Sequence, residues 1–241
     1  MKKLEIYRNQ NYMLNDAFDQ AVMNIHIQKE QNGYKLFTVC SCEPGDGSTT
    51  VAINLAAALA ASGWKTVLVD GDMRKKNNYK RLNEEAKLGL SDYLMEQAEM
   101  KDVIYETTTD MLSYIPCGSL INNPVRMLCS NKMENFQKTL TERYDFVIYD
   151  MPAMNAAMDA NVMAVKSDAC ILVVAMGDTS KKGLLTAANT LKEAKANLLG
   201  VIINKTEMDE YKRYRKNFDY FKKERYIGTA KAALKKNKKT K

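Results

Sequence analysis

Five short, mainly apolar runs recur along the chain, and their alternation with helical stretches limits the possible folds more than any other feature. The segments between them carry apolar residues at helical spacing. Strands that are apolar throughout and alternate with helices are typical of a parallel sheet covered on both faces. The sequence therefore predicts an α/β fold in which helices sandwich a parallel sheet. The expected strands are 36–40, 67–69, 146–149, 170–174 and 201–203, and the expected helices are 11–31, 49–62, 131–141 and 182–196.

A glycine-containing turn joins the first expected strand to the following helix. Its sequence over residues 41–50 is SCEPGDGSTT. Glycines at such a turn let backbone N–H groups point inward around a phosphate, and the helix N-terminus adds its positive dipole end. Thr49 would lie in the first helical turn, with its hydroxyl available to Mg²⁺. Taken alone, a Gly-x-Gly turn is weak evidence, because some such turns are only tight turns.

Carboxylates follow two of the other expected strands. Asp70 and Asp72 come directly after residues 67–69, and Asp150 follows residues 146–149. Ligands of α/β sheets bind at the carboxyl ends of the strands, and Mg²⁺ takes one or two carboxylates together with phosphate oxygens. A single aspartate there is more often a solvated strand end or a helix cap. Two such sites combined with the glycine turn favour a nucleotide and Mg²⁺ site.

The charge of the chain is uneven, which removes nucleic acid as an expected partner. Of the formal net charge of +7, residues 205–241 contribute +9 (14 Lys and Arg, 5 Asp and Glu), and residues 1–204 contribute −2 (22 and 24). A nucleic-acid-binding domain carries its positive charge on the fold itself. With one histidine, zinc sites and histidine-dependent triads are disfavoured. No stretch resembles a leader or a membrane span, so we expect a cytoplasmic protein with reduced cysteines.

Several motifs in order make the chain resemble the bacterial tyrosine kinases of the capsular and exopolysaccharide type. These are P-loop proteins related to the septum-site and partition ATPases. The resemblance spans about residues 12–226. The motifs are the glycine turn at 41–50, the acidic strand ends at 67–74 and 146–150, and then 89–94, 115–118, Asn123-Pro124, Asp150-x-Pro152, Asp159-Ala160 and 200–205.

The resemblance implies a P-loop NTPase fold with three parts. These are an N-terminal segment and helix (1–35), a nucleotide-binding kinase-like domain (36–205) and a flexible basic tail (206–241). It implies that ATP and Mg²⁺ are the cofactors, with Asn204 near the adenine and Asp72 orienting or deprotonating the acceptor hydroxyl. The implied nucleotide-binding residues are Gly45, Asp46, Gly47, Ser48, Thr49, Thr50 and Asn204, the Mg²⁺ ligands Thr49, Asp70 and Asp150, and the catalytic residues Asp70, Asp72 and Asp150.

The same resemblance implies two kinds of partner. Tail tyrosines of one copy would be phosphorylated by neighbouring copies, and a membrane protein that controls polysaccharide chain length would recruit and activate the kinase. Recruitment by that membrane protein would place a cytoplasmic kinase at the inner face of the membrane. The tyrosines that fit this pattern are Tyr211, Tyr214, Tyr220 and Tyr226, although an amphipathic terminal helix would also explain them.

The chain departs from the family pattern at several positions. Ser48 occupies the position of the Walker lysine, and Arg74, Lys75 and Lys76 are candidates to replace its charge. In the first helix, Asp19 and Val22 occupy the positions of two arginines that close a ring of subunits, and Arg126 replaces a glutamate.

These departures leave a second hypothesis beside the kinase, a degenerate kinase that senses nucleotide without transferring phosphate. A partition-type ATPase is less favoured, because the signature lysine of that class is missing before Pro44.

Overall fold

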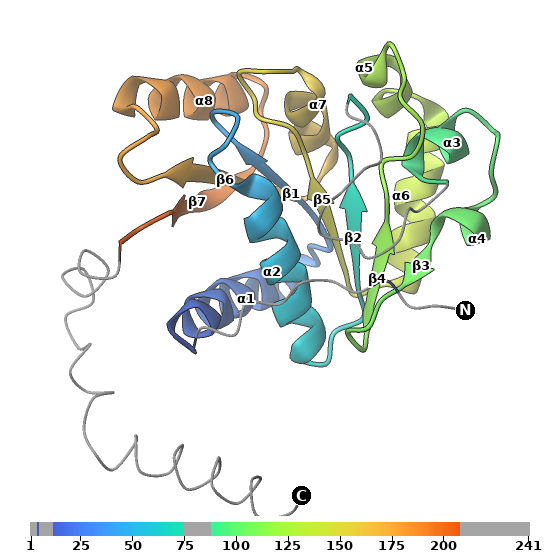
Figure 1. The fold of residues 1–241 in the computed structure, drawn as a ribbon, viewed down its shortest axis with the longest axis horizontal. Helices are drawn as coiled ribbons and strands as arrows, with labels where there is room; N and C mark the ends of the chain where they lie inside the picture. Colours follow the sequence, from blue (N-terminus) through green and yellow to red (C-terminus); the bar gives the residue numbers. More distant parts are fainter. Residues whose placement is uncertain (1–3, 5–11, 75–87, 208–241) are drawn as a thin grey trace, which may run out of the picture. The chain divides into compact units, whose positions relative to one another are not determined.

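The computed structural model describes residue 4 and residues 12–74 and 88–207. Within them, seven strands form one sheet in the order β3-β4-β2-β5-β1-β6-β7 (Figure 1). All neighbouring strands run parallel except β3 and β4. The strands are β1 (Leu36–Ser41), β2 (Thr66–Asp70), β3 (Tyr105–Glu106), β4 (Leu112–Ile115), β5 (Phe146–Asp150), β6 (Ala169–Ala175) and β7 (Leu198–Asn204).

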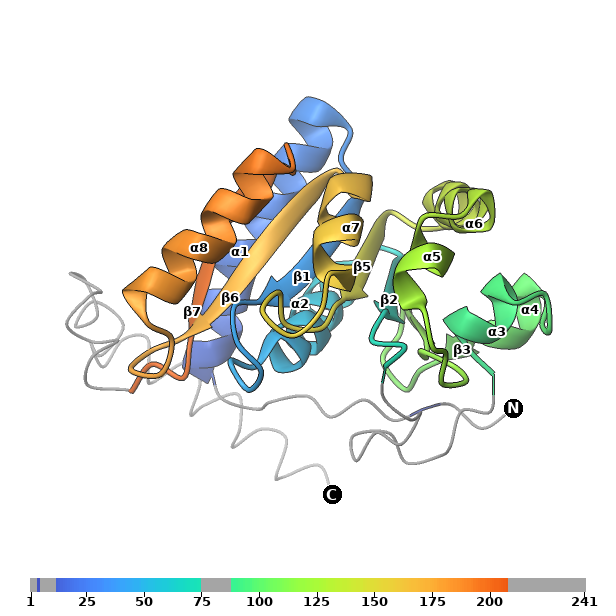
Figure 2. The same ribbon diagram turned by 90° about the horizontal axis from the view of Figure 1, so that it is seen from above.

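Helices cover both faces of the sheet, as the alternation of apolar strands and helices predicts (Figure 2). One face packs against α1 and α2, and the other against the remaining helices. The central strands β2, β5 and β6 are buried along their whole length, which explains why they carry apolar residues without alternation. The helices are α1 (Tyr12–Asn32), α2 (Ser48–Ala61), α3 (Leu90–Leu94), α4 (Met100–Val103), α5 (Pro124–Leu128), α6 (Asn131–Arg143), α7 (Asp159–Lys166) and α8 (Lys181–Glu193).

Helix α1 belongs to the hydrophobic core of the domain. Phe18, Val22 and Ile25 are buried, and they share one apolar cluster with Leu55 and Leu59 of α2. Val22 is only 7% exposed. The position that holds a ring-closing arginine in the resembling family is therefore part of the core here.

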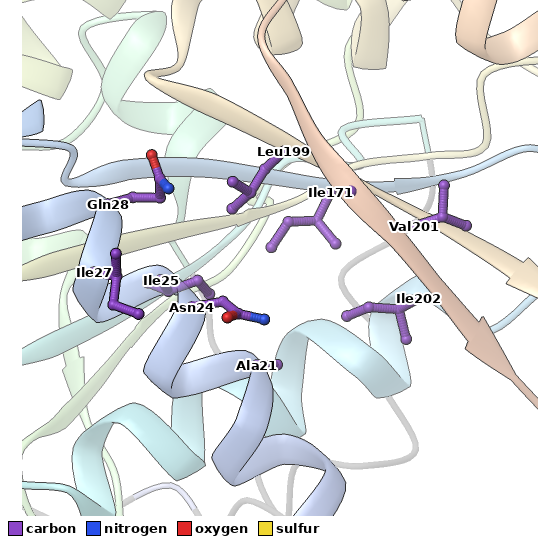
Figure 3. Close-up of a pocket in the computed structure, with 10 residues that line it drawn as sticks. Ala21, Asn24, Ile25, Ile27, Gln28, Ile171, Leu199, Val201 and Ile202 are labelled. Atoms are coloured by element: carbon purple, nitrogen blue, oxygen red, sulfur yellow. The ribbon is translucent and has the colours of Figure 1, made fainter. Parts of the chain in front are cut away.

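An apolar groove of about 340 Å³ separates α1 from the edge of the sheet (Figure 3). The stick view shows Ile25 of α1 facing Ile171 of β6 and Leu199 of β7. No residue of the 41–50 turn lines the groove, so it is separate from the expected nucleotide site.

Two compact units make up the chain, residues 1–204 and residues 205–241. The four tail tyrosines fall outside the described residues, so their role as phosphate acceptors stays a prediction. Among the helices of the described residues, none is long and apolar enough to cross a membrane.

A partly buried lysine links the C-terminal end of α1 to the residue before β5. The Lys29 Nζ lies 2.9 Å from Asp145 Oδ1 and 4.1 Å from the ring centroid of Trp64. The Asp145 Oδ2 accepts a 3.0 Å hydrogen bond from the backbone N–H of Lys65. Burial works against ionisation of Asp145, but the hydrogen bonds from Lys29 and Lys65 outweigh it and lower the pKa of the carboxyl.

We expect Lys29→Met to lower the free energy of unfolding by about 1 kcal/mol at neutral pH, since the pair is partly exposed. A lowered pKa stabilises the fold above the pKa of the unfolded carboxyl and ceases to do so below the folded pKa. The deficit of the variant in urea titrations should therefore shrink below about pH 4. Lys101→Met is the control, because its 2.8 Å contact with Glu99 is exposed on both sides. Equal effects of the two substitutions would contradict the prediction.

Candidate nucleotide site

The turn between β1 and α2 has the geometry of a phosphate-binding loop. Gly45 and Gly47 both have a φ of 95°, a left-handed conformation that side chains with a Cβ rarely adopt. Gly47 caps the helix, and the N–H of Val51 bonds to its carbonyl at 3.1 Å. The next residues, Ser48, Thr49 and Thr50, form the first turn of α2, where backbone N–H groups lack helical partners. The loop and the helix start thus present N–H donors to an anion.

Buried polar contacts hold this loop in place. Asp46 is 2% exposed, and its carboxylate accepts hydrogen bonds from Glu43 N–H (2.9 Å) and Thr179 Oγ1 (2.8 Å). The side-chain amide of Asn204 donates to the carbonyl of Asp46 at 2.8 Å. The structure therefore brings together Asp46 and Asn204, which are both predicted nucleotide contacts. The Asp46 carboxylate itself is hydrogen-bonded to other residues of the protein. The predicted contact of Asn204 with adenine stays a prediction.

The two predicted magnesium carboxylates lie side by side. Asp70 ends β2, Asp150 ends β5, and the two residues are partners in the register of these adjacent strands. Each is 3% exposed. Asp72 is half-buried two residues beyond Asp70, and its N–H donates to Asp70 Oδ1 at 3.1 Å. Gly71 lies between these two aspartates, and a Cβ there would overlap the sulfur of Met151.

This acidic pair fits a magnesium ion that also binds phosphate oxygens. Two carboxylates that leave water together repel each other, so a cation between them lowers the cost of their burial. Mg²⁺ needs few protein ligands and keeps several waters. The described residues contain no cluster of three or more His, Cys, Asp or Glu side chains able to hold a metal. The assignment of Asp70, Asp150 and the Thr49 hydroxyl as Mg²⁺ ligands stays a prediction.

One strong contact at this edge of the sheet could not be predicted from the sequence around either residue. The guanidinium of Arg74 binds both carboxylate oxygens of Asp159, with Nε–Oδ2 at 2.7 Å and Nη2–Oδ1 at 2.9 Å. The hydrogen bonds to Asp159 raise the pKa of Arg74. The sequence makes Arg74 a candidate to replace the charge of the missing lysine, but in the structure its charge is committed to Asp159. The other candidates, Lys75 and Lys76, lie outside the described residues.

Comparison with known proteins identifies the family of the chain. Residues 34–205 match the family described as AAA domain. The chain is 31% identical to the tyrosine-protein kinase CpsD of Streptococcus pneumoniae serotype 4, over 86% of this chain and 89% of that protein. The chain belongs to the bacterial tyrosine kinase family. Its relatives in this family include the putative tyrosine-protein kinase CapB of Staphylococcus aureus, 28% identical over 83% of this chain and 88% of that protein.

Solved structures extend the family likeness to the fold. The chimeric protein CapA2B2 has a TM-score of 0.76 at 28% identity, and the match covers 84% of this chain and 92% of that chain. The septum-site-determining protein MinD of Pyrococcus horikoshii, solved with Mg-ADP, has a TM-score of 0.59 at 26% identity over 72% of each chain. The P-loop fold expected from the sequence is confirmed.

Proposed function

We propose that this chain transfers the γ-phosphoryl group of ATP to tyrosine hydroxyls on the tails of neighbouring copies, and so regulates the synthesis and chain length of a capsular or exopolysaccharide. The observation that carries the proposal is the pairing of Asp70 with Asp150 across β2 and β5, in a sheet whose β1 leads into the phosphate loop. The family supports tyrosine as the acceptor. The proposed acceptors are Tyr211, Tyr214, Tyr220 and Tyr226.

The residues of the chain divide the work of phosphoryl transfer, which consists mostly of positioning and charge neutralisation. The N–H groups of residues 45–50 hold the phosphates. Asp70, Asp150 and Thr49 hold Mg²⁺, which when bound neutralises charge on the phosphate oxygens. Asp72 lies next to this pair and is less buried, which suits a carboxylate that accepts the hydrogen bond of an incoming tyrosine hydroxyl.

We propose that a membrane protein controlling polysaccharide chain length recruits this kinase to the inner face of the membrane. The resemblance to the capsular and exopolysaccharide tyrosine kinases supports such a partner. Transfer between copies requires that the copies associate, and we propose that they do so through neighbouring tails. No nucleic-acid partner is proposed, because the body of the chain carries a net charge of −2.

A second candidate function is nucleotide sensing without transfer. Ser48 favours it, since the loop lacks the lysine that faces the β- and γ-phosphates in relatives, and Arg74 is bound to Asp159 instead. Burial of Val22 also favours it, because the ring contact made through an arginine there cannot form.

A phosphotyrosine assay distinguishes the two functions. The full chain is incubated with Mg·ATP, with and without the cytosolic segment of the membrane activator, and probed for phosphotyrosine. The kinase proposal expects a signal that the activator strengthens. Nucleotide binding without phosphotyrosine under either condition would refute phosphoryl transfer and leave nucleotide sensing as the function.

Replacing all four tail tyrosines by phenylalanine should remove the autophosphorylation signal, because phenylalanine keeps the ring and lacks the acceptor hydroxyl. Mass spectrometry of the wild-type chain identifies the modified peptides. A matched variant with Tyr34→Phe and Tyr93→Phe, two tyrosines of the folded domain, should retain the signal. A signal that survives in the tail variant would place the acceptors elsewhere.

A further inference from the structure

The contact between Arg74 and Asp159 joins two segments that both border the nucleotide site. Asp159 is the first residue of α7, and its side chain is 0% exposed, whereas that of Arg74 is 45% exposed. The buried carboxylate is compensated by the helix N-terminus and by a planar, two-point contact with the guanidinium. Such a contact fixes the orientation of both groups as well as their separation.

Hydrogen bonds connect Arg74 to the acidic residues of the site. The N–H of Arg74 donates to Asp72 Oδ1 at 3.3 Å, and the N–H of Asp72 donates to Asp70 Oδ1 at 3.1 Å. Gly71 N–H bonds to the carbonyl of Asp150 at 2.9 Å. A shift of Arg74 therefore moves the short segment that carries both Asp70 and Asp72.

The other end of the contact is connected to the phosphate loop. The segment between β5 and α7 bonds to the start of that loop, from Met154 N–H to the carbonyl of Ser41 at 2.9 Å and from Asn155 N–H to the carbonyl of Cys42 at 3.2 Å. Asp159 follows this segment directly. The ion pair therefore connects the acidic segment, through the start of α7, to the phosphate loop.

Stability alone is a weak reason for such a pair. Burying a carboxylate is costly, and apolar residues of similar volume often stabilise a core as well as an ion pair does. We propose that Arg74 and Asp159 are positioning residues that set the carboxylates of Asp70 and Asp72 relative to the phosphate loop, so that Mg²⁺ binds with the nucleotide. This inference rests on the proposed Mg·nucleotide site.

The test compares Asp159→Asn and Arg74→Lys with the wild-type chain. Dissociation constants for ADP are measured by calorimetry in EDTA and across a Mg²⁺ titration. Affinity in EDTA should stay within about twofold, because the phosphate loop is intact, while the Mg²⁺ concentration for half-maximal effect should rise about tenfold. Glu134→Gln, which removes the 2.8 Å surface contact with Lys166, is the control and should leave both values unchanged.

A double variant separates positioning from folding. Each single variant loses the two-point contact with the buried side chain at position 159, so its melting temperature should fall. Arg74→Met with Asp159→Leu removes both charges, so it should recover the melting temperature but not the Mg²⁺ response. Recovery of both, or single variants with the wild-type Mg²⁺ response, would overturn the proposal.

The outcome does not depend on phosphoryl transfer. A wild-type chain that binds Mg·ADP but forms no phosphotyrosine refutes the kinase proposal, while the Mg²⁺ titration still tests the ion pair. A wild-type chain whose affinity for ADP does not respond to Mg²⁺ overturns the positioning role.

Discussion

Ser48→Lys is expected to raise the rate of phosphotyrosine formation by about 100- to 1,000-fold, the size of effect found when one preorganised charge acts on a transition state. Ser48 is the first residue of α2, directly after the phosphate loop, so a lysine there would extend from the helix N-terminus at which the phosphates are expected. The described site does not already supply this charge through Arg74, whose guanidinium is bound to Asp159. Affinity for ADP should change less than the rate, since the backbone donors and the helix N-terminus are unaltered.

Ser48→Met is the matched control, because methionine has nearly the length of lysine without its charge. Initial rates are measured with saturating Mg·ATP and the activator segment. The methionine variant should be no faster than the wild type. Equal rates for the lysine variant and the wild type would show that another group already provides the charge or that transfer fails at another step. Equal acceleration by methionine would refute an electrostatic cause.

The main strands were predictable because each is apolar over several residues, and all but β7 lie in the interior of the sheet. The five expected strands all occur, and the last begins at Leu198, earlier than the expected residue 201. Strands β3 and β4 were not predicted. Each is short, and Ser113 interrupts the apolar run of β4, so no local signal distinguished it from a loop. Its burial depends on pairing with β2.

The acidic half of the site was predictable for a topological reason. Parallel strands end at the same edge of a sheet, so aspartates that follow two strands converge there if the strands are neighbours. Asp70 and Asp150 meet this condition. The sequence could not show that β2 and β5 are adjacent, since strand order follows from packing.

Contacts that fix the site across long separations were beyond the sequence. Thr179 and Asp46 are 133 residues apart, and Arg74 and Asp159 are 85 apart. Neither pair lies at a helical or strand spacing, so periodicity carries no information about them. From the sequence, Arg74 is accordingly a candidate to replace the charge of the missing Walker lysine. The structure removes that role, because the guanidinium is bound to Asp159. Family resemblance supplied the chemistry of the acceptor, which geometry alone does not specify.

Gly47→Ala should weaken ADP binding about a hundredfold, which corresponds to about 3 kcal/mol. Two effects add. The φ of 95° is strained for alanine, and a Cβ at Gly47 would overlap the Nδ2 of Asn204, which donates to the carbonyl of Asp46. The loop must shift to relieve both, and each misaligned N–H gives up a charge-assisted hydrogen bond to phosphate worth about 1.5–3 kcal/mol.

Gly63→Ala is the matched control for strain alone. Its φ is 91°, a Cβ added there would meet no other atom within 4 Å, and it follows α2 at the opposite end from the loop. It should lower the free energy of unfolding by about 1–2 kcal/mol and leave ADP affinity unchanged.

A double-mutant cycle separates the overlap with Asn204 from the backbone strain at Gly47. In an Asn204→Ala background, Gly47→Ala should cost about tenfold less ADP affinity than in the wild type, because the overlapping amide is gone. Comparing the two backgrounds cancels any direct contact between Asn204 and the nucleotide. An equal cost in both backgrounds would mean that strain alone disables the loop, and that the amide of Asn204 can move aside without loss.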